Sequence, residues 1–123
     1  MNRLEQTIIK NLIYNEDFTR KVLPFIRADY FSDNTERVVF KEIFAFVEKY
    51  KNLPTHESLV INFTESKTLP EPEVRQSIEL LKELHATKEE KSEPKWLMEN
   101  TEKFCQDKAI YNAIMESVQI LDD

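Results

Sequence analysis

The chain of 123 residues contains no glycine, although average usage predicts about nine in this length. Loops that cradle phosphates need glycine, because the backbone must approach the phosphate closely and adopt a positive φ. The strained turn that carries a hydrolase nucleophile needs it as well. The sequence therefore contains no P-loop, no dinucleotide fingerprint, no kinase glycine loop and no nucleophile elbow.

Cysteine and histidine are also scarce, with one and two residues respectively. Cys105 cannot form an internal disulfide, which fits a reducing compartment. It lies within a strong helical pattern and far in sequence from His56 and His85, and the three residues have no metal-ligand spacing. Acidic pairs such as Glu79 and Glu83 are typical of a solvated helix face. We expect no catalytic residue, no cofactor and no metal.

The chain has too few basic residues for non-specific binding of nucleic acid. The chain has 17 Lys and Arg against 23 Asp and Glu, a net charge of −6, and affinity for phosphate comes mainly from displaced counterions. Its aromatic residues could stack on single-stranded DNA, but such binding needs a basic groove beside them. No apolar run reaches the roughly 18 residues of a membrane span, and the start lacks the apolar region of a signal peptide. We expect a soluble, intracellular protein with no direct nucleic-acid or membrane contact.

Apolar residues recur at helical spacing almost throughout, without sustained alternation. The spacing predicts a helix over 3–14, a second from a cap at 15 to about 24, and a third from a cap at 33 to about 51. It also predicts a short helix after 55, one from the 67–72 loop to about 86, and one from 94 to the end. Asp33 followed by Glu36 matches a capping box. The fold class predicted is all-α.

The expected core lies around the third helix, which is the most aromatic part of the chain. Its predicted buried side comprises Val39, Phe40, Ile43, Phe44, Val47 and Tyr50. In the helix before it, Phe18, Val22 and Phe25 mark the buried side, and Tyr30 and Phe31 anchor the connection that follows.

Residues 87–93 are purely polar and form the expected linker. They divide the chain into a compact bundle of about five short helices over 1–91 and one long C-terminal helix over 92–123. Ser92 is the expected cap of that helix, and Pro94 is tolerated at its start.

The last helix is expected to be longer than the bundle is wide. About 28 residues at 1.5 Å each span roughly 42 Å, whereas a compact domain of this size is about 35 Å across. Its apolar stripe would then lack an intrachain partner, and such stripes mark contacts with other chains. The expected interface residues are Phe104, Tyr111, Ile114, Met115, Val118 and Leu121.

Several alternatives remain open from the residues. The helix could instead break near Gln106 and Asp107 and fold back, or the chain could have been cut before its natural partner helix. Phe104 and Tyr111 could equally belong to the intrachain core. Trp96 could face a partner, although core packing is the favoured interpretation.

Four segments occur in a recognisable order: LEQTII over 4–9, IYNEDF over 13–18, DYFS over 29–32 and VFKEI over 39–43. In this order they resemble the N-terminal domain of DnaB-type replicative helicases. The part from Trp96 to Ala113 more closely resembles the helicases of T-even-like phages. The resemblance covers nearly the whole chain and rests on serial order rather than on one motif.

The resemblance implies a DnaB N-terminal-domain-like fold and a role in DNA replication. Such domains form a collar on the hexameric ring, pair through helical hairpins as a trimer of dimers, and dock primase, here in the cytoplasm of the infected bacterial host. Only the first hairpin arm is visible, over 92–123. The ATPase domain of the full-length ATP-dependent 5′–3′ DNA helicase needs a P-loop, so it is absent here. The alternative is a stand-alone helical adaptor or inhibitor that binds a replicative helicase or primase.

Overall fold

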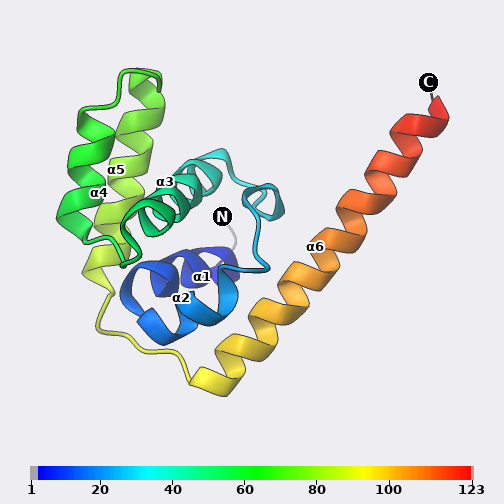
Figure 1. Cartoon of the computed structure of the whole chain (residues 1–123), viewed down its shortest axis with the longest axis horizontal. Coiled ribbons are helices and arrows are strands. Elements are labelled where there is room, and N and C mark those ends of the chain that lie inside the picture. The colour runs from blue at the N-terminus through cyan, green and yellow to red at the C-terminus, as the bar shows by residue number, and fades with distance from the viewer. Residues whose placement is uncertain (1–2, 123) are drawn as a thin grey trace. The chain divides into compact units, whose positions relative to one another are not determined.

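The computed structural model describes residues 3–122, and this part of the chain is helical and has no strand (Figure 1). The α-helices are α1 (Arg3–Tyr14), α2 (Glu16–Val22), α3 (Asn34–Tyr50), α4 (His56–Thr64), α5 (Glu71–Ala86) and α6 (Pro94–Asp122), and a short 3₁₀ turn, η1 (Ala28–Tyr30), precedes α3. The predicted fold class, all-α with about five short helices and one long C-terminal helix, is confirmed.

The chain divides into two compact units, Met1–Lys91 and Ser92–Asp123. The first, called the helical unit below, contains α1 to α5. The second consists of α6. That α6 is the first arm of a hairpin stays a prediction.

The core of the helical unit is built around α1, which packs against α2, α3 and α5, while α5 also packs against α3 and α4 (Figure 1). Apolar side chains three and four residues apart place one face of each helix in this core. Those fully or almost fully buried include Ile8, Ile9, Leu12, Val22, Phe31, Val39, Ile43, Leu59, Phe63 and Leu81.

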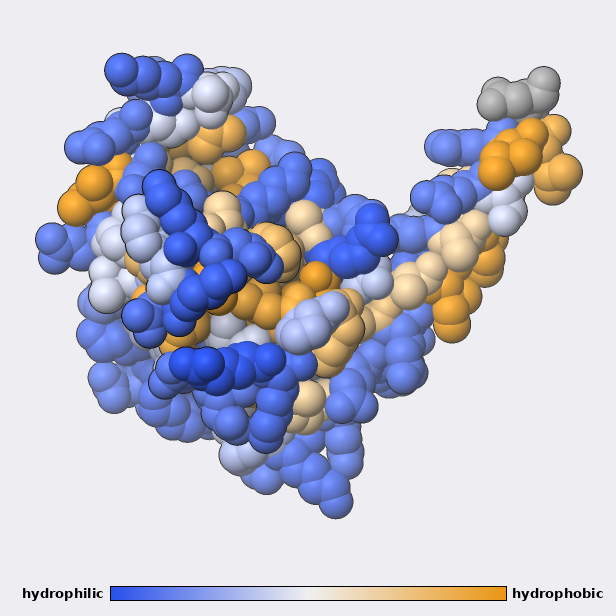
Figure 2. All heavy atoms as spheres, in the orientation of Figure 1, coloured by the Kyte–Doolittle hydropathy of each residue, from blue (hydrophilic) through white to orange (hydrophobic). Residues whose placement is uncertain are grey.

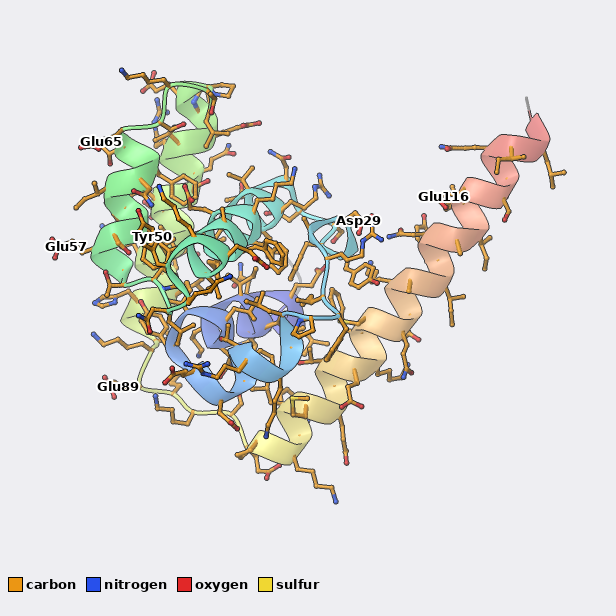
Figure 3. The ribbon with its side chains drawn as sticks, in the orientation of Figure 1. Asp29, Tyr50, Glu57, Glu65, Glu89 and Glu116 are labelled. Carbon is orange, nitrogen blue, oxygen red and sulfur yellow. The ribbon has the colours of Figure 1, made fainter. Side chains whose placement is uncertain are left out.

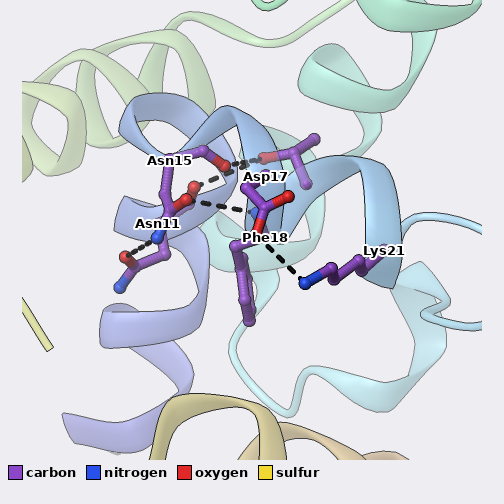
Figure 4. Close-up of polar contacts among 6 residues, drawn as sticks. Asn11, Asn15, Asp17, Phe18 and Lys21 are labelled. Carbon is purple, nitrogen blue, oxygen red and sulfur yellow. Dashed lines mark hydrogen bonds and ion pairs between the residues drawn. The ribbon is translucent and has the colours of Figure 1, made fainter. Parts of the chain in front are cut away.

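Polar contacts fix the tight turn between α1 and α2 (Figure 4). Asn15 caps α2 as predicted: its Oδ1 accepts a hydrogen bond from the Phe18 backbone N–H at 3.1 Å. The buried Thr19 hydroxyl lies 2.9 Å from the Leu12 carbonyl oxygen, to which it donates. Because this carbonyl belongs to the last turn of α1, the contact holds the two helices together.

Only one of the two hydrogen bonds of the capping box predicted at the start of α3 is formed. Asp33 accepts a hydrogen bond from the Glu36 backbone N–H, but neither carboxylate oxygen of Glu36 has a hydrogen-bond partner. Glu36 is fully buried, so its side chain faces the interior instead of returning to the cap. A complete capping box occurs at α4, where Thr55 and Ser58 bond reciprocally.

Several aromatic side chains predicted to be buried are exposed. Phe25 follows Pro24, after α2 has ended at Val22, so it no longer lies on the helical stripe. Phe44 borders a surface groove. Tyr50, in the last turn of α3 (Figure 3), lies with its ring tilted against that of Phe46, with ring centroids 4.6 Å apart. The core prediction is therefore wrong for Phe25, Phe44 and Tyr50.

The connection before α3 carries the two aromatic residues expected to anchor it. Phe31 is buried and packs against Phe40 with ring centroids 5.4 Å apart, whereas Tyr30 is only partly buried. Phe31 is therefore the stronger of the two anchors.

Candidate protein interface

α6 is one uninterrupted helix of 29 residues, which at 1.5 Å each is roughly 43 Å long. Pro94 stands in its first turn, where its missing N–H costs nothing. Glu93, rather than the predicted Ser92, accepts the Trp96 backbone N–H, at 2.7 Å. No proline or glycine follows, so nothing ends the helix early, and the alternative of a break near Gln106 is wrong.

The predicted interface residues all lie on this helix, and most are exposed. Tyr111, Ile114, Met115, Val118 and Leu121 are exposed to between 42% and 84%. Phe104, at 7%, is buried. Figure 2 shows the apolar side chains gathered along the C-terminal part of α6. We call the five exposed residues the stripe.

Sequence reasoning missed Ile110 and Ile120, which are 60% and 74% exposed. Neither was among the residues expected to form the interface. At 100° per residue around the helix, Ile110 lies beside Leu121 and Ile120 lies beside Ala113. Counting every apolar position after Lys108 would have found them.

Together with Ala113, these residues span about 220° of the helix surface between 110 and 121, an arc in which Ser117 is the one polar residue, and which is about twice the width of an ordinary core-facing stripe. The rest is a polar strip of Asn112, Glu116 and Gln119, of which Figure 3 labels Glu116. A helix that is apolar over most of its circumference is typical of a buried position. Its exposure therefore leaves a wide apolar surface on α6.

Trp96 also differs from the favoured interpretation. It is 48% exposed, so its assignment to the core is wrong. Its indole is too far along the helix from the stripe, some 22 Å at 15 residues from Tyr111, to belong to the same contact.

A second apolar surface lies on the helical unit, between α2 and the C-terminal half of α3. It is a groove of about 740 Å³. Its apolar lining comprises Leu23, Pro24, Ile26, Phe44, Val47 and Leu53. Sequence reasoning missed it because the lining comes from segments that meet only in the fold; the sole signal was the surplus of aromatic residues on α3.

The charges at the rim of this groove are already paired. Arg20 contacts Glu16 at 2.6 Å and Lys51 contacts Glu48 at 3.8 Å. An apolar floor with neutralised rim charges favours a protein side chain over a free anion.

Two buried titratable groups have shifted pKa values. Burial, with added repulsion from Glu5 and Asp33, raises the pKa of Glu36 to about 7. Burial raises the pKa of Cys105 to about 11, which keeps its thiol protonated and unreactive.

Residues 3–122 contain no group of three or more histidine, cysteine or acidic side chains placed to hold a metal ion. Within the same range, no helix combines the length and the apolar composition needed to cross a membrane.

No protein-family model matches the chain. It is 28% identical over 115 residues to the DnaB-like replicative helicase of Enterobacteria phage T4. The aligned region covers 94% of this chain but 23% of that helicase. The resemblance to DnaB-type helicases of T-even-like phages is thus confirmed. The all-helical fold of residues 3–122 contains no ATPase domain of the kind that needs a parallel sheet.

Proposed function

We propose that this chain is the N-terminal assembly domain of a phage-type replicative DNA helicase. In this proposal it mediates helicase oligomerisation and primase interaction during DNA replication, and has no catalytic activity of its own. The observation that carries the proposal is the wide apolar surface exposed on α6. The similarity to a phage replicative helicase over nearly the whole chain supports the replication role.

Self-association is the first part of the proposal. An exposed helix with apolar residues at 111, 114, 115 and 118 is suited to pairing with the same helix of a second copy, because the spacing repeats every three and four residues. Large apolar and aromatic side chains carry most of the energy of such contacts. In the full-length ring the pairing would build a trimer of dimers.

Primase binding is the second part. The groove between α2 and α3 gives the helical unit an apolar concavity of its own, on elements other than α6. A partner other than a second copy could use it while the stripe is occupied. The full-length parent would then couple this domain to an ATP-dependent 5′–3′ motor.

The test of self-association compares two pairs of charge substitutions on the same helix. Ile114→Glu with Val118→Glu places two charges on the stripe. Asn112→Glu with Gln119→Glu places the same charges on the polar strip, as a matched control. Sedimentation velocity over a range of concentrations should show a dimer or larger species for the wild type and the control.

The stripe variant should be monomeric while circular dichroism shows unchanged helicity. A wild type that stays monomeric at every concentration would contradict self-association of this chain. For primase, the purified cognate primase should co-elute with the wild type and not with a Phe44→Asp variant that remains folded.

The alternative is a stand-alone helical adaptor or inhibitor of a replicative helicase or primase. Addition of the purified chain to the cognate helicase separates the two proposals. An inhibitor disrupts the preformed helicase hexamer and lowers unwinding, whereas an assembly domain leaves a preformed hexamer active.

A further inference from the structure

One imidazole ring connects the end of α5 to α1 and to the segment that follows α5. His85 Nδ1 lies 2.9 Å from Tyr14 Oη, and His85 Nε2 lies 3.2 Å from Lys88 Nζ. The ring of His56, the first residue of α4, stacks on His85 with centroids 4.2 Å apart. We call Tyr14, His56, His85 and Lys88 the latch.

The contacts define the protonation state of His85. A lysine ammonium group only donates hydrogen bonds, so Nε2 of His85 must be the acceptor and carry no proton. The ring proton is then on Nδ1, which donates to Tyr14 Oη. Burial raises the pKa of Tyr14, so the phenol stays neutral and able to accept. The observed arrangement therefore requires a neutral His85.

We propose that the latch is a proton-operated switch: it holds the first residues after α5 against the helical unit while His85 is neutral, and releases them when His85 gains a proton. A second ring proton would enter at Nε2, directly opposite the Lys88 ammonium group. Two donors that are both cations cannot keep a contact of 3.2 Å. Protonation of His85 and its contact with Lys88 are thus mutually exclusive.

Other groups stand near the two rings. From α1, the Lys10 ammonium donates a hydrogen bond to the Thr87 carbonyl oxygen at 3.3 Å, and Lys10, Thr87, Glu83 and Glu90 line one small pocket. From α4, His56 has a buried Nδ1 with no hydrogen-bond partner. Burial lowers the pKa of His56, and His85 and Lys88 lower it further. The lowered pKa of His56 favours the neutral form of the ring that stacks on His85.

The released segment has a defined place in the chain. Residues 87–93 connect the helical unit to α6, which carries the stripe. The switch therefore adds the His85–Lys88 contact to the Lys10–Thr87 hydrogen bond and the backbone bonds of this turn, which do not depend on the protonation of His85. The proposal stands on the latch geometry alone and does not depend on the proposed function, and its test involves neither self-association nor primase.

The first measurement follows the histidine rings of the full chain by NMR. The chain has two histidines, so a His56→Gln variant assigns both sets of ring signals. At pH 8 the ring nitrogen shifts of His85 should show the neutral form with its proton on Nδ1. The opposite tautomer at pH 8 would overturn the proposal.

The second measurement follows backbone order after α5 by ¹⁵N relaxation. At pH 8 the amides of Lys88 and Glu89 should have order parameters near 0.85, and at an acidic pH where the ring signals show that His85 is protonated, values below about 0.6. Lys88→Met and His85→Phe should give the low values at both pH values. Lys91→Met, which removes the same charge three residues further on, should behave as the wild type.

Order that persists at pH 5 while both rings are demonstrably protonated would overturn the switch. So would a Lys88→Met variant as ordered as the wild type at pH 8. Amide signals of α5 that are unchanged in all variants establish that the fold is intact.

Discussion

At the residue scale, the absence of glycine has a visible cost at the end of α3. Lys51 occupies the left-handed region, with φ of 58° and ψ of 27°, and its N–H bonds to the Val47 carbonyl at 2.8 Å. Glycine is the usual residue at such a position, because a Cβ atom is strained there. Here a lysine adopts this conformation, so the backbone of Lys51 is strained.

Replacement Lys51→Gly should therefore stabilise the helical unit by roughly 1 kcal/mol, the usual penalty for a non-glycine residue in this conformation. The lost Lys51–Glu48 ion pair is exposed and 3.8 Å long, so it offsets little. Chemical denaturation with urea measures the gain. A Lys49→Gly control, within the helix, should be destabilised, and equal effects of both changes would contradict the explanation.

Glu36 makes stability depend on pH. Its folded pKa of about 7 lies above the ordinary 4.5, so the folded state holds its proton more tightly than the unfolded state does. The stabilisation that this gives is complete below pH 4.5 and is lost as the pH rises through 7.

A Glu36→Gln variant cannot ionise and should gain between roughly 1 and 3 kcal/mol relative to the wild type at pH 8, and almost nothing at pH 4. Urea denaturation at a series of pH values measures the difference. Glu79→Gln, an exposed site on α5, serves as control and should leave the profile unchanged. A gain for Glu36→Gln that is equal at pH 4 and pH 8 would show that ionisation is not the cause.

At the scale of the element, the start of α2 depends on one side chain. Asn15→Ala removes the oxygen that accepts the Phe18 N–H and should cost about 1 kcal/mol, and at most about 2. Asp17→Ala, two residues on, loses only an exposed ion pair with Lys21 and should cost less than about 0.5 kcal/mol. Thermal and urea denaturation compare the two variants, and costs of similar size would show that the cap is not decisive.

The elements were largely predictable from the sequence, but their burial was only partly so. Helical spacing identifies an apolar face, and Asn15, Thr55 and Pro94 mark where helices begin, because these signals are local. Whether a neighbour covers that face depends on contacts distant in sequence. Phe44 follows the spacing of α3 and yet borders a groove, and Glu36 follows a cap pattern and yet is buried.

The candidate interface was also only partly predictable from the sequence. The stripe was predictable from apolar residues on one side of α6, and Ile110 and Ile120 would have been predictable from a count of every apolar position after Lys108, because α6 is apolar well beyond that side. The groove between α2 and α3 combines residues that are far apart in the chain. The contact of His85 with Lys88 depends on the exact positions of their side chains. No pattern within one element contains that information.

At the scale of the whole molecule, the two units differ in what stabilises them. The helical unit has a core of its own, whereas residues 110–121 of α6 are almost entirely exposed. An exposed helical segment of this length is marginal in water, because few contacts repay the cost of ordering it. A chain built in this way should not unfold as a single cooperative unit.

Heating should therefore give two transitions by circular dichroism at 222 nm. The first, from the C-terminal part of α6, should move to higher temperature as protein concentration rises, because self-association stabilises only the folded helix. The second, from the helical unit, should not move. In the Ile114→Glu, Val118→Glu variant the first transition should lose its concentration dependence, while in the Asn112→Glu, Gln119→Glu control it should keep it. A single transition that is independent of concentration would mean that α6 is stabilised without a second copy, and would leave the exposed apolar surface to a different protein.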